Sequence, residues 1–193
     1  MTDVAFLDAN VLAKPFTRTL IVVGAAAPTS GYAVTWSKHA EMEADRHLRP
    51  RAKRLRAFRA ERGIPLSPTC GDTSFCVDTD PKDHQILGDA VAAGARWIVT
   101  ENVGDFGWAD LGGTGMAAVH YDLFLTERLG LDGYREALEI LSHGRVPADV
   151  IHANVALLHR RLFDTMAQAF PGVEPAISRH NPPREVLRAP HGL

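Results

Sequence analysis

The stretch "DTDPKDHQILGDAVAAGARWIVT", residues 78–100, predicts a helix that leads directly into a strand. Asp80 is placed to cap the helix, Pro81 suits its first position, and Gly94 is typical of its C-terminal end. Residues 96–100 give the clearest strand signal in the chain, because Trp, Ile, Val and Thr all favour strands. The apolar positions give the helix one face that suits burial: Ile86, Leu87, Ala90, Val91 and Ala93.

Strands and helices alternate on both sides of this stretch. The alternation predicts an α/β fold, with a central mostly parallel sheet and helices on both faces. The expected strands span residues 4–7, 34–36, 75–78, 96–100 and 116–120. The expected helices span about 37–48, 51–61, 81–94, 132–143 and 147–169, and residues 11–27 are expected to form one or two helical turns around Pro15 followed by a helix.

The length of 193 residues suits one main domain with an appendage. We expect that domain over residues 1–125, because the alternation of strands and helices stops after about Phe124. Residues 126–170 are expected to form a helical C-terminal extension. Residues 171–193 hold five of the twelve prolines and are expected to form a flexible tail.

The composition is that of a globular protein, with 46% hydrophobic and 23% charged residues. A net charge of −2 gives no overall positive field, so any nucleic-acid binding must depend on a local patch. Cys70 and Cys76 are too few for a disulfide framework or a zinc knuckle. The N-terminus lacks signal-peptide features, and no segment reaches the ~18 apolar residues of a membrane span. We therefore expect a soluble cytoplasmic protein with no membrane partner.

Acidic and polar residues follow the predicted strands. In an open α/β sheet, ligands bind outside the carboxyl ends of the strands. Carboxylates that converge there repel one another unless a cation lies between them, and a set of oxygen ligands selects Mg²⁺ or Mn²⁺. The residues expected at this edge are Asp8, Asp83, Thr100, Asn102 and Asp105, with Glu41 and Glu43 from the helix at 37–48.

Each acidic position also has an ordinary structural explanation. Asp8 could begin a turn, Asp83 fits a capping box, and Asp105 could cap a helix. Glu41 and Glu43 could be solvated residues of a helix surface. The order and spacing of the whole set, rather than any one residue, therefore carry the hypothesis of a metal site.

Three stretches together resemble the PIN-domain family, especially the PIN ribonucleases that act as VapC-type toxins. They are "FLDANVL" at 6–12, "WSKHAEMEADRHL" at 36–48 and "DPKDHQILGDAVAAGARWIVTENVGDF" at 80–106. The resemblance covers roughly residues 4–125, and the third stretch is the most specific. It implies a PIN-like three-layer fold, to which the helices after residue 125 are an addition.

The resemblance also implies which residues form the site. Asp8 matches the first metal-binding Asp of the family, Asp83 the third acid and Asp105 the fourth. Glu43 matches the helical Glu better than Glu41 does, although both stand in the same frame. The polar residues that match supporting positions are Asn10, Thr100 and Asn102. All four acidic positions are filled, which is typical of an active enzyme.

The implied activity is that of an endoribonuclease dependent on Mg²⁺ or Mn²⁺. Such a site hydrolyses RNA phosphodiester bonds with a metal-activated water, leaving a 5′-phosphate and a 3′-hydroxyl. The resemblance further implies that the chain is the toxin of a type II toxin–antitoxin pair. A cognate antitoxin protein and a homodimer are therefore expected, beside the RNA substrate.

Residues 46–62, "RHLRPRAKRLRAFRAER", carry eight of the chain's 21 Lys and Arg residues. Neutralisation of RNA phosphates is a natural use for such a cluster, although any single residue could belong to a solvated helix face. Leu55 and Phe58 also fit a groove for an antitoxin helix. The candidates for RNA binding are Arg46, Arg49, Arg51, Lys53 and Arg54.

Two other classes of function compete with a ribonuclease. One is a catalytically weak PIN-fold module that binds RNA or a protein partner, and the complete acidic set argues against it. The other is a haloacid-dehalogenase-type phosphatase, which needs a second Asp two residues after the nucleophilic one. Asn10 stands at that position relative to Asp8, so this class ranks lower.

Overall fold

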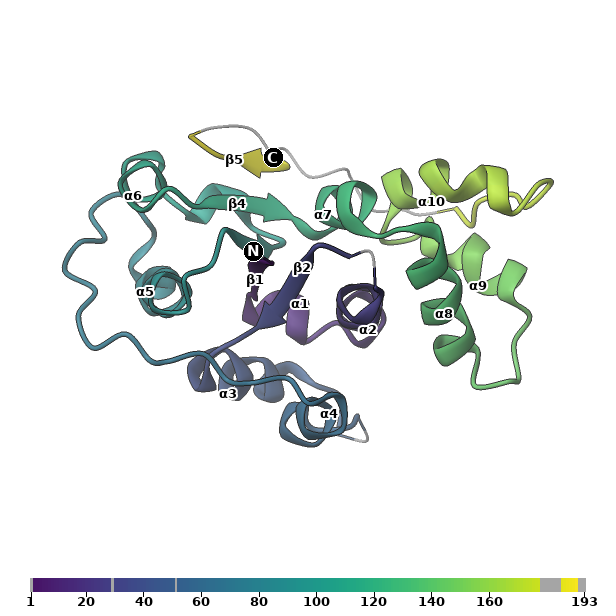
Figure 1. Ribbon diagram of the computed structural model, residues 1–193, viewed down its shortest axis with the longest axis horizontal. Coiled ribbons are helices and arrows are strands. Elements are labelled where there is room, and N and C mark those ends of the chain that lie inside the picture. The colour runs from purple at the N-terminus through teal and green to yellow at the C-terminus, as the bar shows by residue number, and fades with distance from the viewer. Residues whose placement is uncertain (1, 29, 51, 178–184, 191–193) are drawn as a thin grey trace.

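The computed structural model describes residues 2–28, 30–50, 52–177 and 185–190. Its described strands are β1 (Asp3–Leu7), β2 (Tyr32–Thr35), β3 (Trp97–Thr100), β4 (Ala117–His120) and β5 (Leu187–Arg188). They form one sheet in the order β2-β1-β3-β4-β5 (Figure 1). The first four strands are parallel, and β5 pairs antiparallel with β4.

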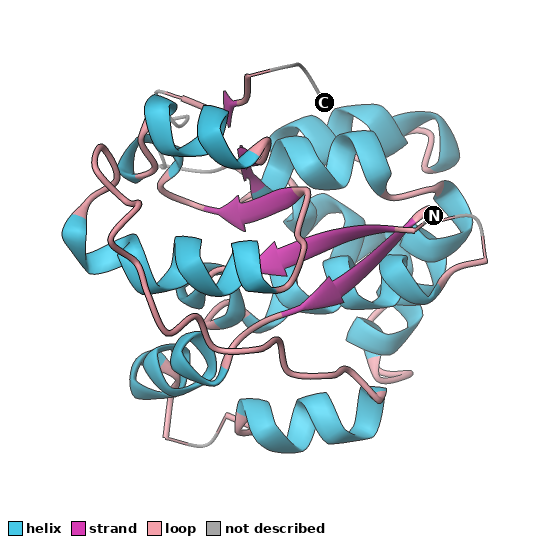
Figure 2. Ribbon diagram, turned by 60° about the vertical axis from the view of Figure 1, so that its left-hand side comes forward, coloured by secondary structure: helices cyan, strands magenta, loops and turns pink. Residues whose placement is uncertain are grey.

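Helices cover both faces of this sheet (Figure 2). The described α-helices are α1 (Ala9–Leu12), α2 (Pro15–Ala26), α3 (Lys38–His47), α4 (Leu55–Arg62), α5 (His84–Ala92), α6 (Trp108–Thr114), α7 (Tyr121–Arg128), α8 (Leu131–Ser142), α9 (Ala148–Val155) and α10 (Arg160–Met166). Short 3-10 turns are η1 (Pro81–Asp83), η2 (Val103–Asp105) and η3 (Ala167–Ala169). The chain steps one way from β1 to β2 and the other way from β2 to β3 and β4. Right-handed crossovers therefore place α2 on one face and α3, α5 and α6 on the other.

Burial is most complete in β3 and β4, whereas β1 is buried only from Ala5 onward. Every residue of β3 and β4 is buried, as expected for parallel strands that are covered on both faces. Trp97 of β3 packs edge-on against Phe124 of α7. Leu7 at the end of β1 pairs with Val99 of β3, so the carboxyl ends of these two strands lie side by side.

The predicted α/β class and most of the predicted elements are confirmed, but the prediction of a strand at residues 75–78 is wrong. These residues lie in turns and bends, and Val77 is exposed. The reason is Asp110 of α6, whose carboxylate accepts the backbone N–H groups of Val77, Asp78 and Thr79. N–H groups held by an aspartate are not available to a sheet.

The prediction of one helix over 147–169 is also wrong. That segment divides into α9, α10 and η3, with a turn at 156–159 between α9 and α10. Asp122 of α7 caps the start of α10, because its carboxylate accepts the N–H groups of Arg161 and Leu162. The helix predicted at 51–61 begins at Leu55 instead.

The C-terminal helices α8, α9 and α10 lie together beside α2 and α7 (Figure 1). α8 approaches α2 closely, since a Cβ built on Gly133 would lie 3.4 Å from the Gly24 Cα. β5 belongs to the segment expected to be a flexible tail, and Arg188 of β5 donates to the Phe106 carbonyl at 2.6 Å. The rest of the expected tail includes residues 178–184 and 191–193, which lie outside the described residues. Across the helices described above, none is long and apolar enough to cross a membrane.

Candidate functional site

Asp8 directly follows β1 and caps α1, so the end of a buried strand presents its carboxylate. Oδ1 accepts the backbone N–H of Ala9 at 2.6 Å. Oδ2 accepts from the Thr100 hydroxyl at 2.7 Å and from Asn10 Nδ2 at 2.6 Å. Because Thr100 ends β3, one carboxylate joins the ends of the two neighbouring strands.

The surroundings of Asp8 also perturb its titration. Burial raises the pKa of Asp8 to about 6, although the donors from Thr100, Ala9 and Asn10 act to lower it. The negative charge of Glu43 raises that pKa further. The charge of Glu43 is therefore part of the electrostatic environment of Asp8.

Asp83 lies where η1 meets α5, with its side chain only 15% exposed. Its Oδ2 is buried and has no hydrogen-bond partner. Burial raises the pKa of Asp83 to about 7, and the charges of Asp8 and Asp105 raise it as well. Asp8, Asp83 and Asp105 are thus one electrostatic cluster at the carboxyl ends of the strands.

Lys82 reaches over the same cluster from solvent. Its Nζ lies 2.9 Å from Asp105 Oδ2, 3.6 Å from Asp80 Oδ2 and 3.9 Å from Asp83 Oδ2. The hydrogen bond to Asp105 is the main cause of a raised pKa for Lys82, so the amine is protonated at neutral pH. A protein cation therefore lies beside two carboxylates of the cluster, Asp83 and Asp105, and beside Asp80.

The two candidate glutamates of α3 have different environments. Glu41 is only 2% exposed, and its Oε2 accepts from Arg59 Nε at 2.9 Å and from Trp36 Nε1 at 3.2 Å. Glu43 is 42% exposed and lies 3.8 Å from a ring nitrogen of His39. Because Glu41 is committed to linking α3 with α4, the geometry favours Glu43 as the helical carboxylate of the cluster.

The polar residues expected to support the site form one network around Asp8. Asn10 Nδ2 donates to Thr100 Oγ1 at 3.1 Å, and Asn10 Oδ1 accepts the N–H of Glu101 at 3.0 Å. Asn102 takes part through its backbone, since its N–H donates to Thr100 Oγ1 at 3.0 Å. The Asn102 residue itself is exposed. Asn10 and Thr100 therefore fix the position of Asp8, while Asn102 orients the Thr100 hydroxyl.

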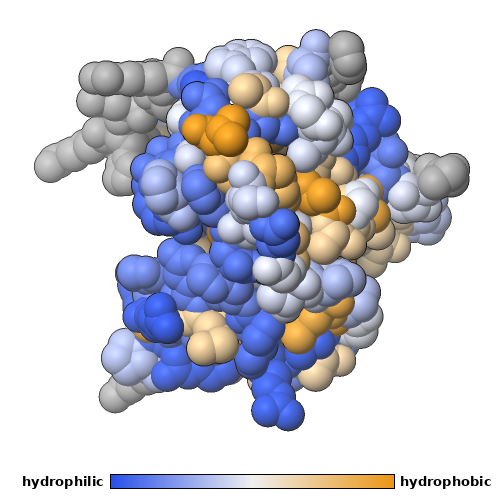
Figure 3. Space-filling view, turned by 90° about the vertical axis from the view of Figure 1, so that its left-hand side faces the viewer, coloured by the Kyte–Doolittle hydropathy of each residue, from blue (hydrophilic) through white to orange (hydrophobic). Residues whose placement is uncertain are grey.

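The basic candidates around α3 and α4 are only partly available to a ligand. Arg46 and Arg49 are exposed. Lys53 pairs with an acid of α4, and Arg54 donates to a backbone carbonyl of α3 at 2.8 Å. Arg51 lies outside the described residues. In Figure 3 the lower part of the molecule, where α3 and α4 lie, has a mostly hydrophilic surface with smaller apolar patches.

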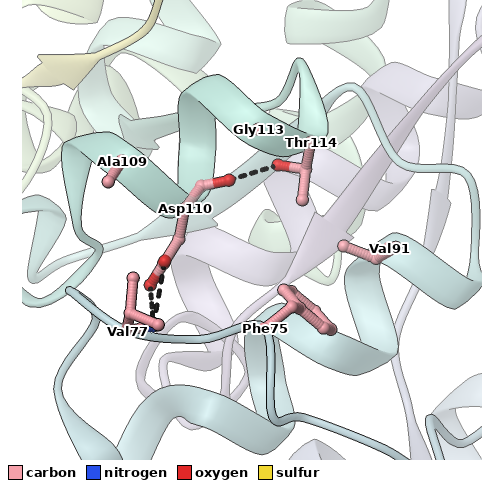
Figure 4. A pocket seen from close by; sticks show the side chains of 7 residues that line it. All are labelled: Phe75, Val77, Val91, Ala109, Asp110, Gly113 and Thr114. Atoms are coloured by element: carbon pink, nitrogen blue, oxygen red, sulfur yellow. Dashed lines mark hydrogen bonds between the residues drawn. The ribbon is translucent and has the colours of Figure 1, made fainter.

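A separate pocket of about 310 Å³ lies between α5, α6 and the segment 75–77 (Figure 4). Its lining is Phe75, Val77, Val91, Ala109, Asp110, Gly113 and Thr114. The Asp110 carboxylate turns toward the backbone of Val77, whose N–H it accepts at 3.0 Å. Since this carboxylate is already hydrogen-bonded, the pocket offers apolar contact rather than an acid or a base.

The donor set of the cluster suits a hard divalent cation. All of its candidate metal ligands are carboxylate oxygens. One of them, the buried Oδ2 of Asp83, accepts no hydrogen bond. Over the described residues, however, no three His, Cys, Asp or Glu side chains are placed so that they could hold a metal ion. The Lys82 ammonium lies between the carboxylates of Asp83 and Asp105. Its volume keeps these two carboxylates apart, and its charge offsets their repulsion.

Two residues at or near the site were not singled out by the sequence. Lys82 stands between Asp80 and Asp83 in the "DPKD" segment, so its spacing could have indicated that it lies beside both. Asp110 has no comparable signal, because the backbone that it holds lies far earlier in the sequence. Only the tertiary structure brings Asp110 to residues 77–79.

Comparison of the chain with family models, curated proteins and solved structures gives no match. The site is therefore interpreted from its own geometry. That geometry is a cluster of carboxylates at the ends of β1 and β3, with one lysine ammonium among them.

Proposed function

We propose that this chain is a metal-dependent endoribonuclease with a PIN-like fold. The observation that carries the proposal is the cluster of Asp8, Asp83 and Asp105, in which one buried oxygen of Asp83 has no hydrogen-bond partner. Buried carboxylates that repel one another are stable as anions only beside a cation. Their place at the carboxyl ends of parallel strands is where such folds bind ligands.

The roles of the residues follow from their contacts. Asp8, Glu43, Asp83 and Asp105 would hold Mg²⁺ or Mn²⁺. The bound cation supplies Lewis-acid activation of a water molecule and neutralises charge at the scissile phosphate. Thr100 and Asn10 keep Asp8 in one orientation, which lowers the cost of arranging ligands when the cation binds.

The substrate and partners belong to the same proposal. Arg46 lies in the last turn of α3, the helix that carries Glu43, and Arg49 follows that helix. Both side chains are exposed and are suited to contact RNA phosphates. The resemblance to VapC-type toxins suggests a role as the toxin of a type II pair, with a cognate antitoxin, a homodimeric state and a cytoplasmic location.

The test is cleavage of a 5′-labelled single-stranded RNA of mixed sequence in Mn²⁺, in Mg²⁺ and in EDTA. Asp83→Asn is the most informative variant, because it removes a charge from an oxygen that has no hydrogen bond to lose. Asp164→Asn, an exposed acid of α10, is the matched control. We expect cleavage by the wild type and the control, loss of at least about 100-fold in Asp83→Asn, and labelled products that end in a 3′-hydroxyl.

Cleavage that persists in EDTA, or that Asp83→Asn leaves intact, would contradict the proposal. A second candidate, an RNA- or partner-binding module on the same fold, is favoured by one observation. Lys82 already neutralises part of the cluster, as in a site that need not bind metal. Retention of RNA by the wild type without any cleavage in either metal would support that module instead.

A further inference from the structure

The segment 185–190 is the part of the chain that the proposed function leaves unexplained. Its strand β5 lies alongside β4 and covers that edge of the sheet (Figure 1). We propose that this segment is a strap, whose docking on β4 orders residues 103–106 through the side chain of Arg188. The coupling concerns backbone order, so it depends neither on RNA cleavage nor on a bound metal.

The strap docks on β4 through its backbone. β5 pairs antiparallel with Ala118 and Val119 of β4, and the His120 N–H donates to the Val186 carbonyl at 2.8 Å. Among the described strands only β3 and β5 pair with β4, so β4 would be an edge strand without the strap. Every residue of β4 is buried, and buried backbone groups need hydrogen-bond partners. The strap supplies such partners on this edge.

The side chain of Arg188 extends the contact from β4 to the segment that follows β3. Its Nη1 donates to the Phe106 carbonyl at 2.6 Å and, more weakly, to the Gly104 carbonyl at 3.4 Å. These carbonyls belong to the residues on either side of Asp105. Because hydrogen bonds from a charged donor are stronger than neutral ones, Arg188 fixes the backbone that presents Asp105.

Two further contacts hold the guanidinium of Arg188 in place. Its Nε and Nη2 lie 3.1 Å and 2.6 Å from the two carboxylate oxygens of Glu185, within the strap. The guanidinium also lies over the ring of Trp108, 5.4 Å from the ring centroid. Since Trp108 begins α6, the strap joins β4, η2 and α6 through one side chain.

The experiment follows amide hydrogen exchange of the full chain by NMR, in EDTA and without RNA. The N–H groups of Asp105 and Phe106 report the order of the segment, because both donate to carbonyls of residues 102–103. The matched control for Arg188→Ala is Arg160→Ala, since Arg160 also pairs with an acid and lies over an aromatic ring. We expect these two amides to exchange at least about tenfold faster in Arg188→Ala, and within about twofold of the wild type in Arg160→Ala.

Two further measurements separate the strap from a general effect on folding. Arg188→Lys keeps the charge but loses the planar fork of donors, so its exchange rates should lie between those of the wild type and Arg188→Ala. Acrylamide quenching of tryptophan fluorescence reports mainly Trp108, because Trp36 and Trp97 are buried. This quenching should rise in Arg188→Ala, which uncovers the Trp108 ring.

Exchange at Asp105 and Phe106 that stays within about twofold of the wild type in Arg188→Ala would overturn the strap. Equal acceleration of the amides of α2 would also overturn it, because Arg188 would then stabilise the whole fold rather than one segment. Neither result bears on RNA cleavage, so the cleavage assay judges the proposed function separately.

Discussion

The Asp8 side and the Asp83 side of the carboxylate cluster are built in different ways. Both oxygens of Asp8 accept hydrogen bonds, from Ala9, Thr100 and Asn10. Asp83 has a buried oxygen with no such partner, and its main neighbour is the ammonium of Lys82 at 3.9 Å. The Asp8 carboxylate is positioned by hydrogen bonds, whereas the Asp83 carboxylate is positioned by an ion pair.

This difference shows how one site can be both rigid and responsive. In the proposed metal site, the hydrogen bonds at Asp8 would fix one carboxylate before a cation binds, which is the preorganisation that such a site needs. A buried oxygen without a partner at Asp83 raises the free energy of the metal-free protein, and a bound cation would relieve it. The following variants test the two sides separately.

The largest effect is expected at Gly107, which holds the segment leading to Asp83. A Cβ built on Gly107 would lie 2.4 Å from the backbone carbon of Asp78, so Gly107→Ala must push that backbone away. We expect the free energy of unfolding to fall by about 2–4 kcal/mol, measured by urea titration. Asp8 should keep its hydrogen bonds, because its partners lie on β3 and α1.

Gly112→Ala is the matched control for this variant, because no atom lies within 4 Å of a Cβ built there. Gly112 lies within α6, so alanine should be neutral or stabilise by up to ~1 kcal/mol. Equal destabilisation by Gly107→Ala and Gly112→Ala would mean that the packing of residue 107 against Asp78 does not position the segment.

The next largest effect tests the Asp8 side. Thr100→Val removes the donor to Asp8 Oδ2 and the acceptor for the Asn102 N–H. We expect a loss of about 1–3 kcal/mol in the free energy of unfolding and a rise in the pKa of Asp8, since that donor lowers it. Thr100→Ser keeps the hydroxyl and should recover most of the loss. Because valine keeps the methyl group of Thr100, a Thr100→Val protein as stable as the wild type would contradict the role assigned to the hydroxyl.

Sequence reasoning succeeded where a signal is local. The capping and periodicity of residues 78–100 predicted α5 and β3, and strand ends predicted that Asp8 and Thr100 would lie close together. It failed at residues 75–78, because "FCVD" is apolar enough for a strand and only Asp110, from a distant helix, prevents one. The break between α9 and α10 likewise depends on a cap from Asp122 of α7.

The resemblance favoured Glu43 over Glu41 as the helical carboxylate, but the burial of Glu41 against Arg59 was not predicted from the sequence. Glu41 and Glu43 are two positions apart, and periodicity alone does not say which one turns inward to Arg59. Their environments differ because Arg59 of α4 pairs with Glu41. Tertiary packing decides such a choice, whereas the residue types leave it open.

A smaller effect on the free energy of unfolding is expected at Asp83, where substitution should stabilise the metal-free protein. Its pKa of about 7 in the folded protein exceeds the ~3.9 of an unfolded aspartate, so the folded state binds more protons between these values. Stability of the metal-free protein therefore falls as pH rises from 4 to 7. Asp83→Asn removes this loss and should stabilise by about 1–2 kcal/mol at pH 7.5 in EDTA, with little change at pH 4. Urea titrations at both pH values measure it, and destabilisation at pH 7.5 would contradict the assignment of a buried anion without a hydrogen bond.

The smallest effect on stability is expected at Glu43, which acts on Asp8 through its charge alone. Glu43→Gln should change the free energy of unfolding by less than about 0.5 kcal/mol, since the side chain is partly exposed and loses only its contact with His39. It should nevertheless lower the pKa of Asp8, because the negative charge that raises it is gone. Carboxyl ¹³C chemical shifts followed across pH report that change directly.

Glu41→Gln is the contrasting control. It leaves Arg59 without its charged partner, so it should lower the free energy of unfolding by about 2 kcal/mol while the pKa of Asp8 stays unchanged. If the two variants exchanged these effects, Glu41 rather than Glu43 would be the helical carboxylate of the site.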